Sequence, residues 1–525
     1  MTLNFLIKQK YEKMKKIIIS LTMLTVLISL TECDDSFLQQ VPQNGTTSEG
    51  LFFKKKADFD GLAFGAYHEL NGYVWDTGVG SWAIVSGSIL RDITQLDETP
   101  RILTDYITPT AGFVSSSWQI NYKIVSRANE LLNQVSKVSK GILTDPEVES
   151  LTGEAKFLRG FGYLGLAQRF GSVPLYLKAF DVADTETPKQ GCAPEAEVWN
   201  QVILDLTDAA AKLPKDWDAA NLGRATTGSA LAFLANAYMY KKDWANAKKA
   251  SDDLIALGKY ALHPNVRELF SIKKENTIES IFEVQFGYQK GGTINWNPDT
   301  PDYGNALGFI TSPKGVGNDY ANNSGTGEAP MRKKLADAFD PNDLRRKFLV
   351  LAPGEMYVAE GFKAPKDTLI LSTDPAKIPQ QNSAFSTKYW IGPDFDPSDG
   401  SQRWFGAQNN PLFRYAEFLL NYAEILFELG DINGAYTQLN LVRVRAGVPA
   451  RTAQANRDVF FADLMLERRF ELNFEPQLVF HFMRTGYLKT HLENDGVTFD
   501  PKWLKFPIPS SETDLNANLC QNAGY

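Results

Sequence analysis

Two stretches of the chain decide its fold: SALAFLANAYMYKKDWANAKKASDDLIAL at 229–257 and PLFRYAEFLLNYAEILFELGDINGAYTQLNLVRVRA at 411–446. Each stretch contains an apolar helical segment, then an aspartate, Asp243 or Asp431, and then a second helical segment. Aspartate is a favoured N-cap because its carboxylate accepts a hydrogen bond from the first turn of a helix. The two stretches therefore predict two copies of one helix pair, of which the second begins with a helix at Pro411–Leu429.

The helix pairs carry a small residue at the same place. Ala247 and Ala435 each follow the capping aspartate by four positions, which lets the paired helices approach closely. This pattern resembles degenerate tetratricopeptide repeats, whose helix pairs stack into a superhelix. We therefore expect a mainly α protein with a tetratricopeptide-like helical-repeat scaffold.

Upstream of the first pair, apolar residues at three- and four-residue spacing predict more helices. The clearest are 57–70, 117–135 and 147–170, and the last should end at Gly171, followed by Pro174. A glycine just past a helix and a proline shortly after it are typical of a helix C-terminus. Residues 51–271 are thus expected to form an N-terminal helical-repeat region.

The sequence between the two helix pairs has a different character. Residues 272–410 are rich in Gly, Pro, Asn and aromatic residues and have weak periodicity, with short strands expected at 281–286 and 368–371. An irregular segment of this length usually carries function. We interpret it as a loop-rich ligand-binding insertion, with 411–525 forming a C-terminal helical region that packs on the same body.

Aromatic residues outside the helical stripes are candidate sugar contacts. The apolar face of a pyranose stacks on an aromatic ring while its hydroxyl groups bind amides and carboxylates. The alternative is that these rings only anchor loops to the core. The nominated ligand-binding residues are Trp75, Trp82, Asp92, Asn295, Trp296, Tyr303, Tyr320, Trp390 and Trp404.

The N-terminus has the pattern of an export signal. Two lysines precede an apolar run at 17–30, which is too short to span a membrane, and Cys33 follows. Met14 stands directly before the lysines and is favoured as the translation start. We interpret 1–32 as a signal peptide, Cys33 as a lipidation site and 33–50 as a polar tether. Glu32 departs from the small residue preferred before an acylated cysteine, and it supports the alternative of an unlipidated exported protein.

Composition excludes several function classes. The chain has 525 residues and a net charge of −8, and removal of the leader makes it more acidic. An acidic body repels phosphate backbones, so no nucleic-acid partner is expected. The three cysteines and four histidines have no metal-ligand spacing, and the cysteines indicate no disulfide framework. No recognisable catalytic motif occurs, so we expect no enzyme activity, no metal and no cofactor.

One acidic segment, 394–400, partly matches a calcium-binding loop. Its glycine falls one position late and no glutamate closes the loop, so a solvated acidic turn is the preferred interpretation.

An ordered set of motifs resembles the SusD/RagB family of outer-membrane lipoproteins over nearly the whole mature chain. The motifs are Phe37-Leu38, Trp118-x-x-x-Tyr122, Arg127-Ala128-Asn129, Gly153 to Arg159, Phe170 to Leu175, Arg224-Ala225-Thr226, Arg414 to Glu417, Tyr422-Ala423-Glu424, Arg443-x-Arg445-Ala446-Gly447, Glu467 to Leu472, Phe506-Pro507-Ile508-Pro509 and Gln521 to Tyr525.

The resemblance implies a role in nutrient uptake. Family members face the cell exterior in Bacteroidetes, bind a glycan or peptide, and pass it to a SusC-like TonB-dependent transporter. Two alternatives remain open from the residues: a helical-repeat scaffold that binds peptide or protein, and a glycan hydrolase. The chain departs from the family pattern at 474–481, where the usual Gly-His-Arg is absent, and this departure bears on packing more than on function.

The charged motifs are expected to be structural. The pairs Glu154 with Arg159, Arg414 with Glu417, and Glu467 with Arg468 and Glu471 are interpreted as scaffold ion pairs. The Pro-Ile-Pro string at 507–509 and the final five residues are expected to hold the C-terminus against the body.

Overall fold

The computed structural model describes residues 52–74, 82–93, 107–180, 189–271, 273–286, 305, 307–311, 327, 329–355, 383–390 and 408–525. The predicted leader, Cys33 and tether lie outside these ranges. The long helices are α4 (Lys56–Val74), α6 (Gly112–Val138), α7 (Asp145–Phe170), α8 (Glu195–Lys212), α9 (Thr227–Tyr240), α10 (Trp244–Ala256), α14 (Tyr415–Glu428), α15 (Ile432–Arg445) and α16 (Arg457–Leu472).

Shorter elements complete the described chain. The helices are α5 (Trp82–Ile89), α11 (Leu307–Thr311), α12 (Lys333–Ala336), α13 (Leu344–Leu349), α17 (Leu478–Thr485), α18 (Tyr487–Asn494) and α19 (Ser510–Thr513). The strands are β1 (Ser280–Val284), β2 (Met331–Arg332), β3 (Val350–Leu351), β4 (Ser383–Ser386) and β5 (Asn410–Arg414). The prediction of a mainly helical fold with few short strands is confirmed.

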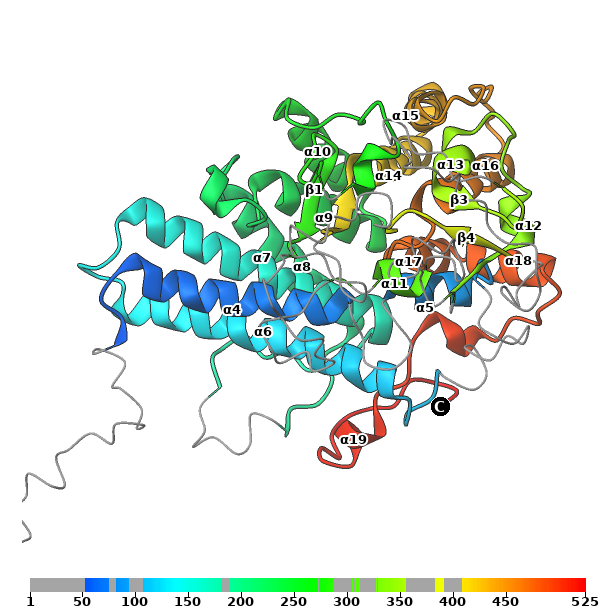
Figure 1. Cartoon of the computed structure of the whole chain (residues 1–525). Coiled ribbons are helices and arrows are strands. Elements are labelled where there is room, and N and C mark those ends of the chain that lie inside the picture. The colour runs from blue at the N-terminus through cyan, green and yellow to red at the C-terminus, as the bar shows by residue number, and fades with distance from the viewer. Residues whose placement is uncertain are drawn as a thin grey trace, which may run out of the picture. The chain divides into compact units, whose positions relative to one another are not determined.

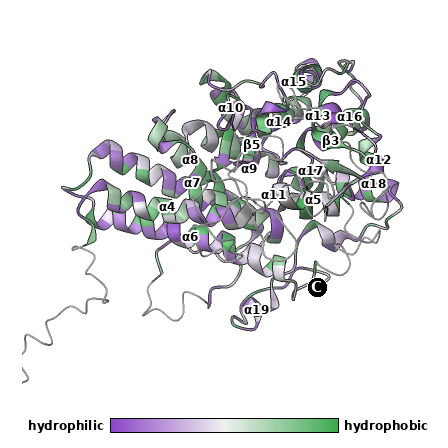
Figure 2. Cartoon of the chain, in the orientation of Figure 1, coloured by the Kyte–Doolittle hydropathy of each residue, from purple (hydrophilic) through white to green (hydrophobic). Residues whose placement is uncertain are grey.

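The helices form one continuous row in which each packs against the next. The order of contact is α6, α7, α8, α9, α10, α14 and α15, so the row skips the insertion and continues with the C-terminal helices (Figure 1, from cyan at α6 to orange at α15). This continuous row is the stacking expected of helix-pair repeats. Figure 2 shows that α6 and α7 each carry both apolar and polar residues.

Helix α7 lies at the centre of the N-terminal part of this row and is buried along most of its length. Its glycines permit close approach of the neighbouring helix: a Cβ at Gly162 would lie 2.9 Å from Cγ2 of Val125 in α6. The helix ends at Gly171, whose φ of 74° is a conformation that favours glycine. The predicted C-cap is therefore confirmed.

The two predicted helix pairs are present as α9–α10 and α14–α15. The side chain of Asp243 accepts a hydrogen bond from the backbone N–H of Asn246 (3.3 Å), and Asp431 accepts one from Gly434 (2.8 Å). Ala247 and Ala435 are fully buried. The shared N-caps and the packing role of the alanines are confirmed.

The predicted start of the second pair is wrong. Residues 410–414 form strand β5, which pairs antiparallel with β1, and the helix begins only at Tyr415. Leu412 and Phe413 are buried in this two-stranded sheet. Their apolar run matches both a helix and a buried strand, and the partner strand lies far away in sequence, so periodicity alone selected the wrong element.

The insertion has its own small sheet and apolar cluster. Strands β2, β4 and β3 lie in that order, all antiparallel, and Met331, Leu335 and Leu349 pack with Phe470 of α16. Strand β1 agrees with the strand predicted at 281–286, whereas the strand predicted at 368–371 lies outside the described residues. The insertion is thus attached to the C-terminal helices through an apolar contact.

The final residues are held as predicted. The side-chain amide of Gln521 accepts from the backbone N–H of Ile508 (2.7 Å) and donates to its carbonyl oxygen (2.8 Å). Asn522 donates to the carbonyl oxygens of Phe170 and Phe506.

In the described part of the chain, no helix has the length and apolar character needed to cross a bilayer.

Candidate functional site

Most of the nominated ligand-binding residues lie outside the part of the chain that the structure describes. Trp82 is the first residue of α5, and its side chain also lies outside that part. Asp92 and Trp390 are described with their side chains. The undescribed residues are Trp75, Asn295, Trp296, Tyr303, Tyr320 and Trp404, as is the acidic segment 394–400.

Asp92 and Trp390 are enclosed by protein. The carboxylate of Asp92 forms an ion pair with Arg469 of α16, with Nε at 3.1 Å from Oδ2, and the residue is 2% exposed. Trp390 is also 2% exposed and follows β4. Asp92 therefore connects the end of α5 to α16, and neither side chain offers a surface to a sugar in this conformation. Sequence reasoning identified both as loop residues but contains no signal for which face of a loop is covered.

The ends of two undescribed segments meet at one place, although they are distant in sequence. The backbone N–H of Phe286 donates to Oδ1 of Asn409 (2.8 Å), and Nδ2 of Asn305 donates to the carbonyl oxygen of Gln408 (2.9 Å). We call these four residues the loop junction. In the sequence, Phe286 and Asn305 flank residues 287–304, and Gln408 follows 391–407, so residues of the junction border the segments that contain Asn295, Trp296, Tyr303 and Trp404.

Two carboxylates, the half-buried Glu275 and the buried Glu283, contact the loop junction. Glu275 accepts from the backbone N–H of Asn409 (2.7 Å), and Glu283 accepts from its side-chain amide (3.2 Å). Burial raises the pKa of Glu275 to about 7, and it raises the pKa of Glu283 as well. Sequence reasoning missed both residues, because the chain contains 62 carboxylates and only the tertiary contacts with Asn409 distinguish these two.

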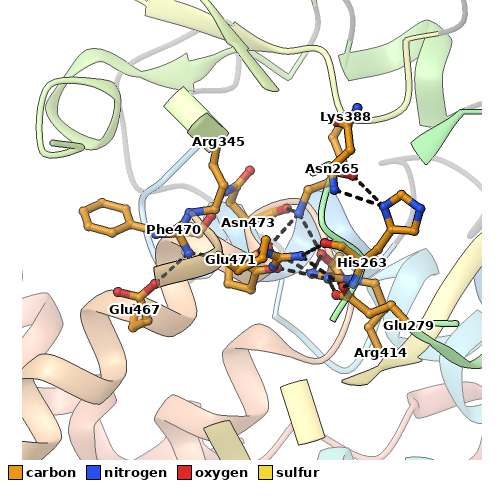
Figure 3. Close-up of polar contacts among 12 residues, drawn as sticks. His263, Asn265, Glu279, Arg345, Lys388, Arg414, Glu467, Phe470, Glu471 and Asn473 are labelled. Atoms are coloured by element: carbon orange, nitrogen blue, oxygen red, sulfur yellow. Dashed lines mark hydrogen bonds and ion pairs between the residues drawn. The ribbon is translucent and has the colours of Figure 1, made fainter. Parts of the chain in front are cut away.

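The insertion rests on a buried ion network centred on Arg414, at the end of β5 (Figure 3). Its guanidinium contacts Glu279 (2.6 Å), Glu471 of α16 (3.0 Å) and Glu475 (2.7 Å). All four side chains are at most 5% exposed. One arginine therefore connects the strand pair β1–β5 to α16 and to the turn that follows it.

A second buried arginine extends the network into the insertion. Arg345 of α13 binds Asp343 (2.8 Å), Glu467 (2.7 Å) and Glu471 (2.9 Å). From the other side, Arg443 of α15 binds Glu467 (2.7 Å). Burial acts to raise the pKa of Glu471, but Arg445, Arg414 and Arg345 outweigh it and hold that pKa well below its usual value. Glu471 is therefore ionised, and its ion pairs connect α16 to α13, α15 and β5.

Lys388, just after β4, is fully buried and also bridges the insertion to α16. Its Nζ donates to Glu475 (2.7 Å) and to the carbonyl oxygens of Glu471 (3.0 Å) and Asn473 (2.8 Å). Burial lowers the pKa of Lys388 to about 8, although Glu475 acts against that shift. The ammonium group thus has both an ionic partner and helix-end carbonyls.

The network is balanced in charge, as low-dielectric burial requires. Five cations face five carboxylates within it. The members are Arg345, Lys388, Arg414, Arg443 and Arg445, with Glu279, Asp343, Glu467, Glu471 and Glu475.

The predicted scaffold role of the charged motifs is correct, but the predicted partners are not. Instead of Glu417, Arg414 contacts the network carboxylates, and Glu417 contacts His481 (2.9 Å). Arg468 contacts Glu424. Side chains close in sequence on a helix point to different neighbours, so the partners come from other elements.

The same correction applies to the N-terminal motif. Glu154 of α7 binds Arg224 (2.5 Å) and accepts from Tyr67 Oη (2.9 Å), whereas Arg159 binds Asp205 of α8 (2.7 Å). These contacts connect α7 to its neighbours on both sides. The two partners, Arg224 and Asp205, are both buried.

The fold defines a class: a helix-pair scaffold that carries an irregular insertion, as in SusD-like outer-membrane binding proteins. Two family profiles match the chain, "SusD family" at residues 279–525 and "Starch-binding associating with outer membrane" at 37–239. The chain belongs to the SusD/RagB family. This family is one of surface glycan-binding proteins associated with the outer membrane, and its members are not enzymes.

Characterised relatives span most of the chain at low identity. A SusD-like protein of Bacteroides ovatus is 24% identical, over 87% of this chain and 80% of the relative. The starch-binding protein SusD of Bacteroides thetaiotaomicron is 23% identical, over 73% and 74%. Surface glycan-binding protein A of Bacteroides thetaiotaomicron, solved with laminarihexaose, has a TM-score of 0.71 at 22% identity and covers 89% of this chain and 99% of its own.

Proposed function

We propose that this protein captures oligosaccharides at the cell surface and delivers them to a SusC-like TonB-dependent transporter in the outer membrane. The observation that carries the proposal is the loop junction. Its residues flank, in the sequence, the segments that contain three nominated aromatic residues and Asn295, and they are fixed to one another by hydrogen bonds. A stacking site for sugar rings needs such a rigid support.

The relatives support an oligosaccharide as the ligand class. One protein with a similar fold was solved with laminarihexaose, and another relative is named for starch binding. Both ligands are glucose polymers, and aromatic stacking suits such chains because each ring presents an apolar face. A peptide ligand is the alternative, since helical-repeat scaffolds also bind extended peptides.

Calorimetric titration with a panel of oligosaccharides tests the proposal. Trp296→Ala and Trp404→Ala, which alter two segments at the junction, are expected to abolish binding and leave the melting temperature unchanged. Phe180→Ala is the matched control, because it removes an exposed aromatic ring outside the nominated set. If no oligosaccharide of the panel binds and peptides bind tightly, the protein is a peptide-binding scaffold. Release of shorter sugars would indicate hydrolysis.

The lipid anchor and the transporter partner need separate tests. We propose that Cys33 carries the acyl anchor that holds the protein on the outer face of the outer membrane. Cys33→Ala should move the protein from the membrane fraction to the soluble fraction without changing sugar affinity. Co-purification of a TonB-dependent barrel with the membrane-bound protein is the expected result for the partner, and its absence after gentle solubilisation would contradict it.

A further inference from the structure

The fold brings together the two cysteines of the chain that follow Cys33. Cys192 directly precedes Ala193, which forms an isolated bridge with Val173, and α8 begins at Glu195. Cys520 lies five residues before the C-terminus. Residues 189–191, directly before Cys192, contact residues 516–518, just before Cys520. Sequence analysis found no disulfide framework because the two residues are far apart along the chain.

Two further contacts hold the segments around these cysteines in register. Nδ2 of Asn516 donates to the carbonyl oxygen of Gln190 (2.9 Å), and Nδ2 of Asn518 donates to that of Lys189 (2.8 Å). A Cβ at Gly191 would lie 3.3 Å from the carbonyl oxygen of Asn518. The two backbones therefore run in contact immediately before each cysteine, which is the proximity that a disulfide requires.

Both cysteines are also fixed from their other sides. The bridge between Val173 and Ala193 holds the residue after Cys192, with the backbone N–H of Ala193 donating to Val173 at 3.0 Å. Gln521 and Asn522, which follow Cys520, are bound to Ile508 and Phe170. Residues on both sides of each cysteine are therefore anchored, which keeps the two cysteine-containing segments beside each other.

The surroundings also suit oxidation. Cys520 is exposed and Cys192 is partly buried, and both are free thiols in this structure. An exposed thiol is the one that an oxidant reaches first. Disulfides persist in proteins that are exported from the cytoplasm. The predicted leader and the family's association with the outer membrane indicate that this chain is such a protein.

We propose that Cys192 and Cys520 form a disulfide that fastens the C-terminal segment to the loop before α8. The two electrons and two hydrogens pass to the disulfide of a thiol oxidoreductase in the export compartment. The Cys520 sulfur first forms a mixed disulfide with the oxidoreductase. The Cys192 sulfur then displaces it, and the oxidoreductase leaves as a dithiol.

Peptide mapping of the protein purified from the cell envelope tests this bond directly. Free thiols are alkylated in denaturant, and the chain is then cut with trypsin without reductant. Cleavage after Lys189, Lys212 and Lys505 yields peptides 190–212 and 506–525, each with one cysteine. The expected result is one linked species that separates on reduction. Separate alkylated peptides, or a link from either peptide to Cys33, would overturn the proposal.

A melting experiment supplies an independent readout. Dithiothreitol is expected to lower the melting temperature of the wild-type protein by several degrees, because the bond restricts the unfolded chain. The double variant Cys192→Ser with Cys520→Ser should show no such shift. Equal behaviour of the two proteins would overturn the proposal. If the double variant does not fold, the peptide map of the wild-type protein decides, and neither test depends on sugar binding.

Discussion

The helix pairs α9–α10 and α14–α15 share a design but differ in what they bury. Both begin their second helix at a capping aspartate, and α10 packs against α14 in the continuous row. Helix α9 buries mainly apolar residues such as Phe233, whereas α14 buries the charged residues Glu417 and Glu424. The same backbone unit is thus stabilised mainly by apolar contact in one copy, and by apolar contact together with buried ion pairs in the other.

The difference follows from what each pair supports. The apolar pair packs against neighbouring helices and, through Phe233, against Phe282 of β1 and Phe413 of β5, where buried area suffices. The charged pair lies in the part of the fold where β5, α15 and α16 meet the insertion through Arg345 and Lys388. Directional ion pairs specify how these elements pack together. Each buried charge needs its partner, because an unpaired buried charge destabilises the fold. The two pairs should therefore respond differently to substitution.

The largest effect is expected for Glu471→Ala. This change leaves Arg345, Arg414 and Arg445 each without one carboxylate partner in a buried site. We expect the free energy of unfolding to fall by about 5 kcal/mol, at the upper end for a broken buried pair. Urea unfolding followed by circular dichroism measures it. Glu493→Ala, which breaks an exposed pair with Lys489, is the control and should cost less than about 1 kcal/mol. Equal losses would refute the distinction.

A smaller loss is expected for Phe233→Ala in the apolar pair. Phe233 packs edge-on against Phe161, Phe282 and Phe413, so its removal leaves a cavity between α9 and the strand pair. The cost should be about 3 to 4 kcal/mol in the same unfolding assay. Phe233→Leu is the matched control and should recover much of the loss. If Phe233→Ala lowered the free energy of unfolding less than Phe233→Leu does, apolar contact would not be the main source of stability in this pair.

The shared part of the two pairs predicts equal effects. Asp243→Ala and Asp431→Ala each remove an N-cap hydrogen bond, and each should lower the free energy of unfolding by about 1 kcal/mol. Asp253→Ala, in an exposed pair with Lys249, is the control and should change it by no more than about 0.5 kcal/mol. If the two cap variants differed severalfold, the pairs would not share one design.

The last prediction concerns pH. Burial raises the pKa of Glu417 from 4.5 to about 8, and burial holds the pKa of His481 well below its usual value. The folded carboxyl group keeps its proton up to about pH 8, whereas the unfolded one releases it near 4.5. Stability from this group is therefore present at low pH and declines as pH rises between these values.

Glu417→Gln tests that sign. The variant should lose less stability than the wild-type protein when the pH is raised from 5 to 8, as measured by melting temperature. Glu493→Gln, at an exposed carboxylate, should follow the wild-type curve. An equal decline in Glu417→Gln and the wild-type protein would show that the carboxyl group is already ionised in the fold.

Sequence reasoning succeeded where the signal was local. Asp243 and Asp431 cap helices because the capping bond spans three residues, and Gly171 ends α7 because its backbone conformation disfavours a side chain. The order of the motifs likewise identified the family. It failed at Pro411–Leu429, where pairing with β1 turned the first residues of a predicted helix into a strand.

The candidate site divides in the same way. Composition located the aromatic insertion, and whether its nominated residues bind a sugar is a proposal for the titrations above. The loop junction of Phe286, Asn305, Gln408 and Asn409 has no local signature, because its members come from distant segments. The same is true of the five-against-five ion network.

The sequence by itself determined the helix-pair units, their caps and the family, because each of these depends on residues a few positions apart. Only the tertiary structure decided which charges pair, where Asp92 and Trp390 lie, and that the segments before Cys192 and Cys520 contact each other. Such contacts join distant parts of the chain. They follow from how helices stack and which faces are buried, and no local periodicity encodes that.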